Sequence, residues 1–239
     1  TKLEKALYFH DYLIRNTAYS DQNTTYCTSE WGVLLKGKGN CQGYAKAYAL
    51  LLQKVHIPVK FANSYSMMHM WNVVRLQGKW YHVDLTWDDP LNPNTHKDQP
   101  GLVLHENFLC STSYLKKKGY RGIRCKLTTS SKYDHKYWKR VNSAFYYQKG
   151  RFIYQTDRAV RQRKRIAGGA ARTLARAGGS LFVKGSKGRF YFINFNRIYY
   201  YNGRTHQVKL VWEGGKKYAS YQAAQLSFAN GRLKVGLLR

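Results

Sequence analysis

Three side chains in the first ninety residues have the types and the order of a thiol nucleophile with its base. Cys41 comes first, His69 follows, and Asp84 is third. A cysteine thiolate attacks carbonyl carbons, a histidine carries the proton, and a carboxylate fixes the tautomer of the histidine. The three residue types in this order predict acyl transfer through a thioester, provided that the fold brings them together.

The residues around Cys41 predict a helix that begins at the thiol. Asn40 is a good N-cap, apolar residues recur at helical spacing up to a close near Val55, and Pro58 follows. In the first turn, the unpaired N–H groups and the helix dipole favour a thiolate, and the Cys41 N–H can hold an oxyanion. The alternative for a lone cysteine before a helix is a buried, inert thiol.

His69 and Asp84 fall on the two arms of a predicted hairpin. The strands 70–76 and 79–83 are joined by a turn at Gln77-Gly78. Pairing about this turn puts position 69 opposite about position 86, and position 71 opposite about position 84. The two side chains are therefore expected to be close neighbours.

These motifs resemble the bacterial transglutaminase-like family, which shares the papain-like core of transglutaminases and peptide N-glycanases. The motifs are Gly39-x-Cys41-Gln-Gly-Tyr-Ala, His69-x-Trp-Asn and Trp80-Tyr-His-Val-Asp-x-Thr-Trp-Asp-Asp-Pro. The resemblance implies an α+β papain-like fold with the nucleophile helix packed on an antiparallel sheet. It also implies Cys41 as nucleophile, His69 as general base and acid, and Asp84 as the orienting carboxylate.

The resemblance extends over roughly the first 135 residues, because 107–109, 113–114 and 129–133 are similar to the closing segment of the family. It implies no cofactor. Near Tyr120 the family often has a histidine, and this chain departs from that pattern.

Three further residues are candidates for the oxyanion site or the cleft. Trp31 offers an indole N–H as a second oxyanion donor, the role a tryptophan has in transglutaminases, although its motif does not match and core packing is the alternative. Gln42 is either a polar lining residue or a surface amide. Trp71 either walls the cleft or fills the core beneath it.

The other cysteines leave two alternatives open. Cys110 and Cys125 bracket a short basic segment and either form a disulfide, which favours an oxidising compartment, or stay reduced; Cys27 is left over. No two cysteines have the spacing of a CxxC half-site, so no metal is expected.

Charge divides the chain. The net charge is +29, and residues 107–239 hold 30 Lys and Arg against 3 Asp and Glu, whereas residues 1–106 hold 11 against 9. A polycation of this kind attracts anionic polymers, with cell-wall polymers as the first candidate and nucleic acid as another. A hydrophobic content of 44% argues against a disordered chain, and no apolar run reaches the length of a membrane span.

The pattern changes after about residue 138. Short aromatic strands alternate with Gly- and Asn-containing turns such as Asn230-Gly231, which predicts an all-β meander with propeller-like repetition. The basic cluster 161–165 is expected to interrupt this meander, and the Gly/Ala/Arg-rich stretch 166–179 is expected to form a mobile loop. We therefore expect a catalytic domain at 1–138 and a basic β-rich repeat domain at 139–239.

Two classes of function follow from these observations. The first is a cysteine acyltransferase acting on peptide or protein amides, as a peptidase, an amidase or a cross-linking transglutaminase. The second is a non-catalytic binding module for an anionic polymer. A secreted or cell-envelope protein is expected in either case, although no charged-then-apolar leader opens the chain.

Overall fold

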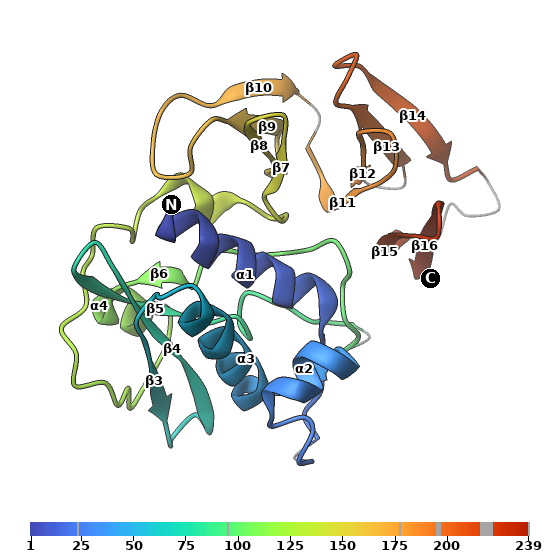
Figure 1. The fold of residues 1–239 in the computed structure, drawn as a ribbon. Helices are drawn as coiled ribbons and strands as arrows, with labels where there is room; N and C mark the ends of the chain where they lie inside the picture. Colours follow the sequence, from blue (N-terminus) through green and yellow to red (C-terminus); the bar gives the residue numbers. More distant parts are fainter. Residues whose placement is uncertain (23, 95, 177, 195–196, 216–221, 239) are drawn as a thin grey trace. The chain divides into compact units, whose positions relative to one another are not determined.

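A computed structural model describes residues 1–22, 24–94, 96–176, 178–194, 197–215 and 222–238 (Figure 1). The chain forms two compact units. Unit 1 comprises Thr1–Pro90 and Leu104–Lys139, and unit 2 comprises Leu91–Val103 and Arg140–Arg239. The segment Leu91–Val103 thus groups with the second unit although it lies before residue 138. Gly101 lies in this segment, and a side chain there would meet Val183 at 2.7 Å.

The helices of unit 1 follow from local signals. Helix α1 (Lys2–Asn16) starts at a capping box between Thr1 and Glu4. Helix α2 (Glu30–Lys36) ends at Gly37, whose φ of 63° is the left-handed conformation of a helix C-cap. The other helices are α3 (Cys41–Lys54), α4 (Thr112–Lys117) and the 3₁₀ helix η1 (Tyr137–Arg140).

A four-stranded antiparallel sheet forms the other half of unit 1. Its spatial order is β3-β4-β5-β6, so that β3 and β6 are the edges. Its strands are β3 (Val59–Ser64), β4 (His69–Leu76), β5 (Lys79–Val83) and β6 (Phe108–Cys110). A separate parallel pair joins β1 (Ala18–Tyr19) and β2 (Lys38–Gly39) ahead of the nucleophile helix.

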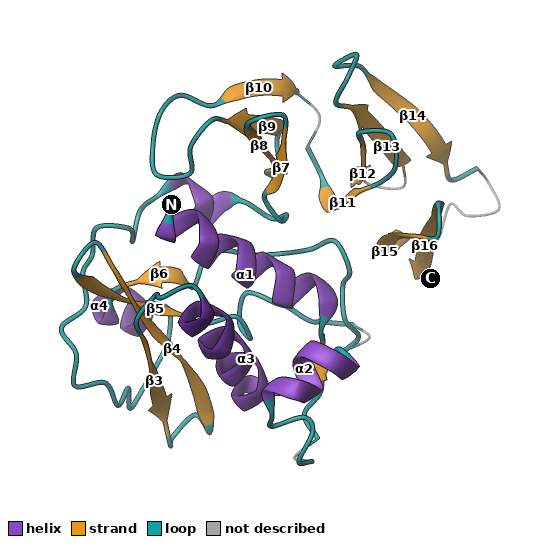
Figure 2. Ribbon diagram, in the orientation of Figure 1, coloured by secondary structure: helices purple, strands orange, loops and turns teal. Residues whose placement is uncertain are grey.

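Helices α1 and α3 lie side by side, and α3 packs on the sheet through β3 and β4 (Figure 2). Between the helices, the hydroxyl of the buried Tyr48 donates to the carbonyl of Ala6 over 3.0 Å. On the sheet, alternate residues of β4 face opposite sides. Trp71 and Val73 point into a core cluster that includes Leu115 of α4. The sheet is therefore covered on both faces, which fixes its register.

Unit 2 consists of antiparallel β-sheets in sequence order. Two four-stranded sheets have the orders β10-β9-β8-β7 and β11-β12-β13-β14, and β15 pairs with β16. The strands are β7 (Tyr146–Gln148), β8 (Arg151–Gln155), β9 (Val160–Arg163), β10 (Arg172–Ala175), β11 (Ser180–Lys184), β12 (Arg189–Asn194), β13 (Arg197–Asn202), β14 (Val208–Glu213), β15 (Gln222–Ala229) and β16 (Arg232–Leu238). Such four-stranded meanders have the strand order of propeller blades.

The predicted fold class, an α+β core followed by an all-β meander, is confirmed. Asn230 and Gly231 have φ of 50° and 74° and make the tight turn between β15 and β16, as the sequence predicts. Two expectations for this region are corrected: the expected loop 166–179 contains the strand β10, and the basic cluster 161–165 lies in part on β9, with which β10 pairs. No helix among the described residues is long and apolar enough to cross a membrane.

Candidate active site

Cys41 is the first residue of α3 and lies where the helix presents free donors. The side chain of Asn40 accepts hydrogen bonds from the backbone N–H groups of Gln42 (3.0 Å) and Gly43 (3.3 Å). Among the described residues, none accepts a hydrogen bond from the Cys41 N–H. The half-buried thiol therefore lies at the positive end of the helix dipole, beside a backbone donor that can receive an oxyanion.

The residues after Cys41 in the motif anchor this end of the helix. A Cβ on Gly43 would lie 2.4 Å from the carbonyl oxygen of Cys27, so only glycine allows the close approach. The buried hydroxyl of Tyr44 donates to the carboxylate of Asp89. The Cys-Gln-Gly-Tyr motif therefore fixes where the thiol lies.

His69 and Asp84 meet across the hairpin in the predicted register. Asn72 pairs with Val83, which continues to position 71 opposite position 84. The buried His69 Nε2–H donates to Asp84 Oδ2 over 2.6 Å, so that Nδ1 is the ring nitrogen left for the thiol. The rings of Trp71 and Trp87 lie nearly parallel to the imidazole, at 5.4 and 5.5 Å between centroids. These contacts hold the ring in one orientation.

Four donors converge on the carboxylate of Asp84. Oδ2 accepts from His69 and also from the hydroxyl of Tyr120 over 2.7 Å. Oδ1 accepts from the backbone N–H groups of Thr86 (3.1 Å) and Trp87 (3.3 Å). Tyr120 is buried and was not predicted as a site residue. The motif comparison singled out its position only as a departure from the family.

Replacing Tyr120 with phenylalanine is expected to slow acylation of Cys41 about tenfold. The ring packing would remain, but one hydrogen bond to a charged group would be lost from Asp84, and such bonds contribute about 1.5–3 kcal/mol. The acylation rate of the variant checks this expectation. Tyr114→Phe, which removes a half-buried hydroxyl elsewhere in unit 1, is the control. Equal rates for both variants would contradict a positioning role for Tyr120.

The pKa of the Cys41 thiol is lowered and the pKa of the His69 imidazole is raised. Burial opposes ionisation of Cys41, but hydrogen bonds from the His69 side chain and the Met70 backbone, together with the His69 charge, lower the pKa of the thiol. Burial likewise opposes the charge on His69, but Asp84, with help from Cys41, raises the pKa of the imidazole to about 10. The environment therefore favours a thiolate–imidazolium pair near neutral pH.

The His69-x-Trp-Asn motif connects the hairpin to the nucleophile helix through a hydrogen bond. Asn72 Nδ2 donates to the carbonyl of Ala45 on α3 over 2.9 Å, one turn beyond the thiol. Trp71 Nε1 donates to His82 Nδ1 over 2.9 Å, and burial lowers the pKa of His82 to about 4. His82 is therefore a neutral, structural histidine.

The three oxyanion or cleft candidates are placed differently from one another. Trp71 is buried, and its indole N–H is already used by His82, so it forms part of the core beneath His69. Trp31 is 44% exposed on α2. The side chain of Gln42 is exposed on the first turn of α3. Of the donors considered, the Cys41 N–H is the one whose position is tied directly to the thiol.

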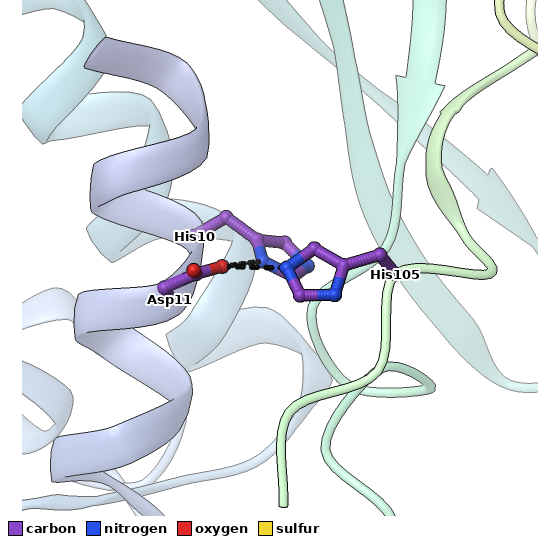
Figure 3. Close-up of side chains that lie close together, drawn as sticks. All are labelled: His10, Asp11 and His105. Carbon is purple, nitrogen blue, oxygen red and sulfur yellow. Dashed lines mark hydrogen bonds and ion pairs between the residues drawn. The ribbon is translucent and has the colours of Figure 1, made fainter. Parts of the chain in front are cut away.

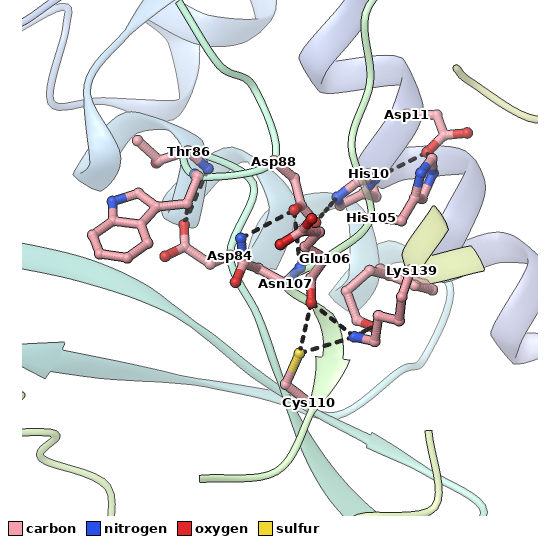
Figure 4. A network of polar contacts seen from close by, with 12 residues as sticks. His10, Asp11, Asp84, Thr86, Asp88, His105, Glu106, Asn107, Cys110 and Lys139 are labelled. Atoms are coloured by element: carbon pink, nitrogen blue, oxygen red, sulfur yellow. Dashed lines mark hydrogen bonds and ion pairs between the residues drawn. The ribbon is translucent and has the colours of Figure 1, made fainter. Parts of the chain in front are cut away.

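A buried polar cluster joins α1 to the segment after residue 104 (Figure 3). Asp11 Oδ1 accepts from His10 Nδ1 and from His105 Nε2, each over 2.9 Å. The other ring nitrogen of His10, Nε2, donates to Asp88 Oδ2 over 3.1 Å. Asp88 also accepts from the backbone and side chain of Asn107 (Figure 4). Asp88 and Asp89 are thus buried structural carboxylates.

The same cluster contains the donor atoms that a metal ion would need. The ligand atoms of His10, Asp11 and His105 lie within 4.8 Å of one another. The distances of 2.9 Å from Asp11 Oδ1 to His10 Nδ1 and to His105 Nε2 are those of charge-assisted hydrogen bonds. We therefore interpret the cluster as an ion-pair network that holds α1 in place.

All four cysteines are free thiols, so of the two alternatives for Cys110 and Cys125 the structure has the reduced one. Cys110 is buried, and the ammonium of Lys139 lies 3.0 Å from its sulfur (Figure 4). Burial raises the pKa of the Cys110 thiol to about 12. This cysteine is consequently a packing residue rather than a second nucleophile.

Comparison with known families gives the fold class of the segment that carries this site. Residues 1–85 match the model of the transglutaminase-like superfamily. This segment is a transglutaminase-like core. The match contains Cys41, His69 and Asp84, and it supports a cysteine-dependent enzyme. It ends at residue 85, short of the roughly 135 residues over which the motifs resemble the family.

Comparison with individual proteins adds little to the transglutaminase-like assignment. No curated protein matches the chain significantly. One solved structure, of a candidate cysteine protease from Cytophaga hutchinsonii, is similar at 20% identity with a TM-score of 0.31. The match covers 39% of this chain and 33% of that one.

Proposed function

We propose that unit 1 catalyses cysteine-dependent acyl transfer on peptide or protein amides, with a thioester at Cys41 as the intermediate. The observation that carries the proposal is the Cys41–His69–Asp84 arrangement, in which the pKa of the thiol is lowered and that of the imidazole is raised to about 10. Activation of the thiol by an adjacent imidazole is what nucleophilic catalysis at neutral pH requires.

In the first half of the reaction, the Cys41 thiolate attacks the amide carbonyl carbon. The N–H of Cys41 donates to the oxyanion that forms on the carbonyl oxygen. As the C–N bond breaks, the imidazolium of His69 gives its proton to the leaving amine, and the thioester remains. Asp84 holds the imidazole so that its free nitrogen faces the sulfur.

In the second half, an acceptor nucleophile attacks the thioester carbonyl. His69 takes the proton from the acceptor, and the C–S bond breaks to release the Cys41 thiolate. Water as acceptor gives a peptidase or amidase, and an amine gives a transglutaminase-type cross-link. Both outcomes use the same residues and need no cofactor.

We propose that unit 2 holds the enzyme at an anionic polymer of the cell envelope. This proposal is supported by the 22 Lys and Arg against 3 Asp and Glu in residues 91–103 and 140–239, which make up unit 2. Retention on isolated cell walls should fall steeply with rising salt, as counterion release requires. Stronger, equally salt-dependent binding to nucleic acid would favour the alternative partner. Full biological effect from a Cys41→Ala protein would favour a non-catalytic binding module.

Trapping of the acyl-enzyme tests the proposed chemistry. With p-nitrophenyl acetate as acyl donor, we expect an acetyl thioester on Cys41, identified by peptide mass spectrometry. It should be discharged by water or by an added primary amine. Cys41→Ala should lose the adduct, and Cys125→Ala, which removes the other half-buried thiol, should keep it. Acetylation spread over other residues, with Cys41 unmodified, would contradict the proposal.

A further inference from the structure

A groove in unit 1 borders the outer edge of strand β3. Its volume is about 550 Å³, and it is lined by Lys60 and Phe61 on β3 and by the four residues 124–127. This volume is in the range of ligand-binding pockets. Cys41, His69 and Asp84 do not line it, so the proposed acyl transfer leaves the groove without a role.

The backbone of β3 offers hydrogen-bonding groups to this groove. The carbonyl of Pro58, just before β3, accepts from the N–H of Arg75 on β4. In the same register, the backbone groups of the even-numbered residues of β3 bond to β4 and those of the odd-numbered residues face outward. Asn63 follows this rule, because its backbone exchanges hydrogen bonds with Arg124. Phe61 is the neighbouring outward position. Among the described residues, none bonds to its outward N–H or C=O.

The chain after Arg124 does not close this edge. Continued antiparallel pairing from Asn63 and Arg124 would bring Lys126 opposite Phe61, but Asn63–Arg124 is an isolated bridge. The groove occupies the place where the next pair would lie. An open strand edge of this kind is a template for a further strand.

The side chains that line the groove favour a negatively charged ligand. Lys60, Arg124 and Lys126 are exposed, and no acidic side chain lines the groove. The guanidinium of Arg124 lies over the ring of Tyr65 at 4.1 Å, which limits the positions that it can adopt. Phe61 is 46% exposed and adds an apolar surface. The three cations and the open backbone fit an extended chain that carries carboxylates.

We propose that this groove binds an extended acidic peptide segment as an added strand on β3. The backbone of Phe61 pairs with the peptide, and Lys60, Arg124 and Lys126 take its carboxylates. The proposal concerns binding alone and is independent of the chemistry at Cys41.

Cys125 provides a reporter inside the groove. Its thiol is half-buried among the lining residues, so a bound peptide should shield it from alkylation. The test uses the full chain with Cys41→Ala, which removes the other half-buried thiol, and site-resolved mass spectrometry of alkylated Cys125. The probe is an acetylated, amidated Glu-Val-Glu-Val-Glu peptide.

We expect the probe to slow alkylation of Cys125 saturably. Lys60→Gln with Lys126→Gln should weaken this protection about tenfold, the size expected when two exposed ion pairs are lost. Lys2→Gln with Lys5→Gln, an equal loss of charge on α1, should leave it unchanged. N-methylation of the probe backbone should abolish protection, because it removes the strand donors.

Three results would overturn the proposal. The first is an alkylation rate that the probe does not change. The second is equal weakening by the two pairs of lysine substitutions, which would mean non-specific attraction. The third is equal protection by the N-methylated probe or by inorganic phosphate at matched ionic strength, which would mean an anion site without strand addition.

Discussion

Replacing Asp84 with asparagine is expected to reduce the rate of acylation at Cys41 by about 10³- to 10⁴-fold, as loss of the orienting carboxylate does in other triads. Four donors converge on the two oxygens of Asp84. An amide has one acceptor oxygen, and its NH₂ group would face donors. The imidazole would lose the charge that offsets its burial, so the pKa of His69 should fall from about 10 to 6.5 or below.

Rapid-quench acylation of the purified variant measures this loss. Asp21→Asn, which removes one exposed carboxylate, is the matched control and should acylate at the parental rate. The thermal unfolding midpoint separates loss of chemistry from loss of fold. A folded Asp84→Asn protein within tenfold of the parental rate would show that Asp84 does not orient the base.

Replacing His10 with alanine is expected to destabilise unit 1 by about 3–5 kcal/mol near pH 6. Such a cost is typical when one partner of a buried ion pair is removed. Asp11 and Asp88 would each lose one hydrogen bond and the nearby positive charge of His10 in the interior, although His105 and Asn107 still donate to them. Urea unfolding should show a midpoint lower by more than about 1 M. His135→Ala, at an exposed histidine, is the control and should change the midpoint little.

The destabilisation by His10→Ala should depend on pH. Burial opposes the charge on His10, but the hydrogen bonds to Asp11 and Asp88 raise its pKa from 6.5 to about 9. A raised pKa stabilises the folded state fully below 6.5, and this contribution is lost as the pH rises through about 9. The difference between parent and variant should therefore shrink from pH 6 to pH 10. A difference that stays constant or grows over this range would contradict a charged His10.

The catalytic half of the fold could be predicted because its signals are local. Asn40 marks the start of α3, and Gln77-Gly78 fixes the hairpin register that brings His69 to Asp84. Both follow from a cap and a turn within a few residues. The resemblance of the motifs to a family then implied how these elements pack together.

The remaining contacts of the site depend on the tertiary fold and left no comparable signal. Tyr120 reaches Asp84 from 36 positions away along the chain, and His105 reaches Asp11 from 94. The spacing of these residues along the chain does not predict either hydrogen bond. The burial of Trp71 was also undetermined, because a tryptophan beside a catalytic histidine can face either the cleft or the core. Its hydrogen bond to His82 decides for the core.

In unit 2, composition was a poor guide to strand limits. Arg161 and Arg163 lie on β9, although the run of cations suggested an interruption of the meander. Alternation explains the difference, because Val160 and Gln162 are buried whereas Arg161 and Arg163, on the other face of the strand, are half-buried. Turn residues were better guides, as Asn230 and Gly231 show.

The rate of iodoacetamide alkylation at Cys41, measured from pH 4 to 9 and resolved by site, tests the central claim most directly. Because the pKa of Cys41 is lowered and that of His69 is raised, the parent should react well below the free-thiol pKa of about 8.5. His69→Ala should remove this acid limb and slow the reaction at pH 6 at least about 30-fold, since a free thiol is about 0.3% ionised there. A parent that titrates like a free thiol, or an unchanged profile in His69→Ala, would contradict an activated nucleophile.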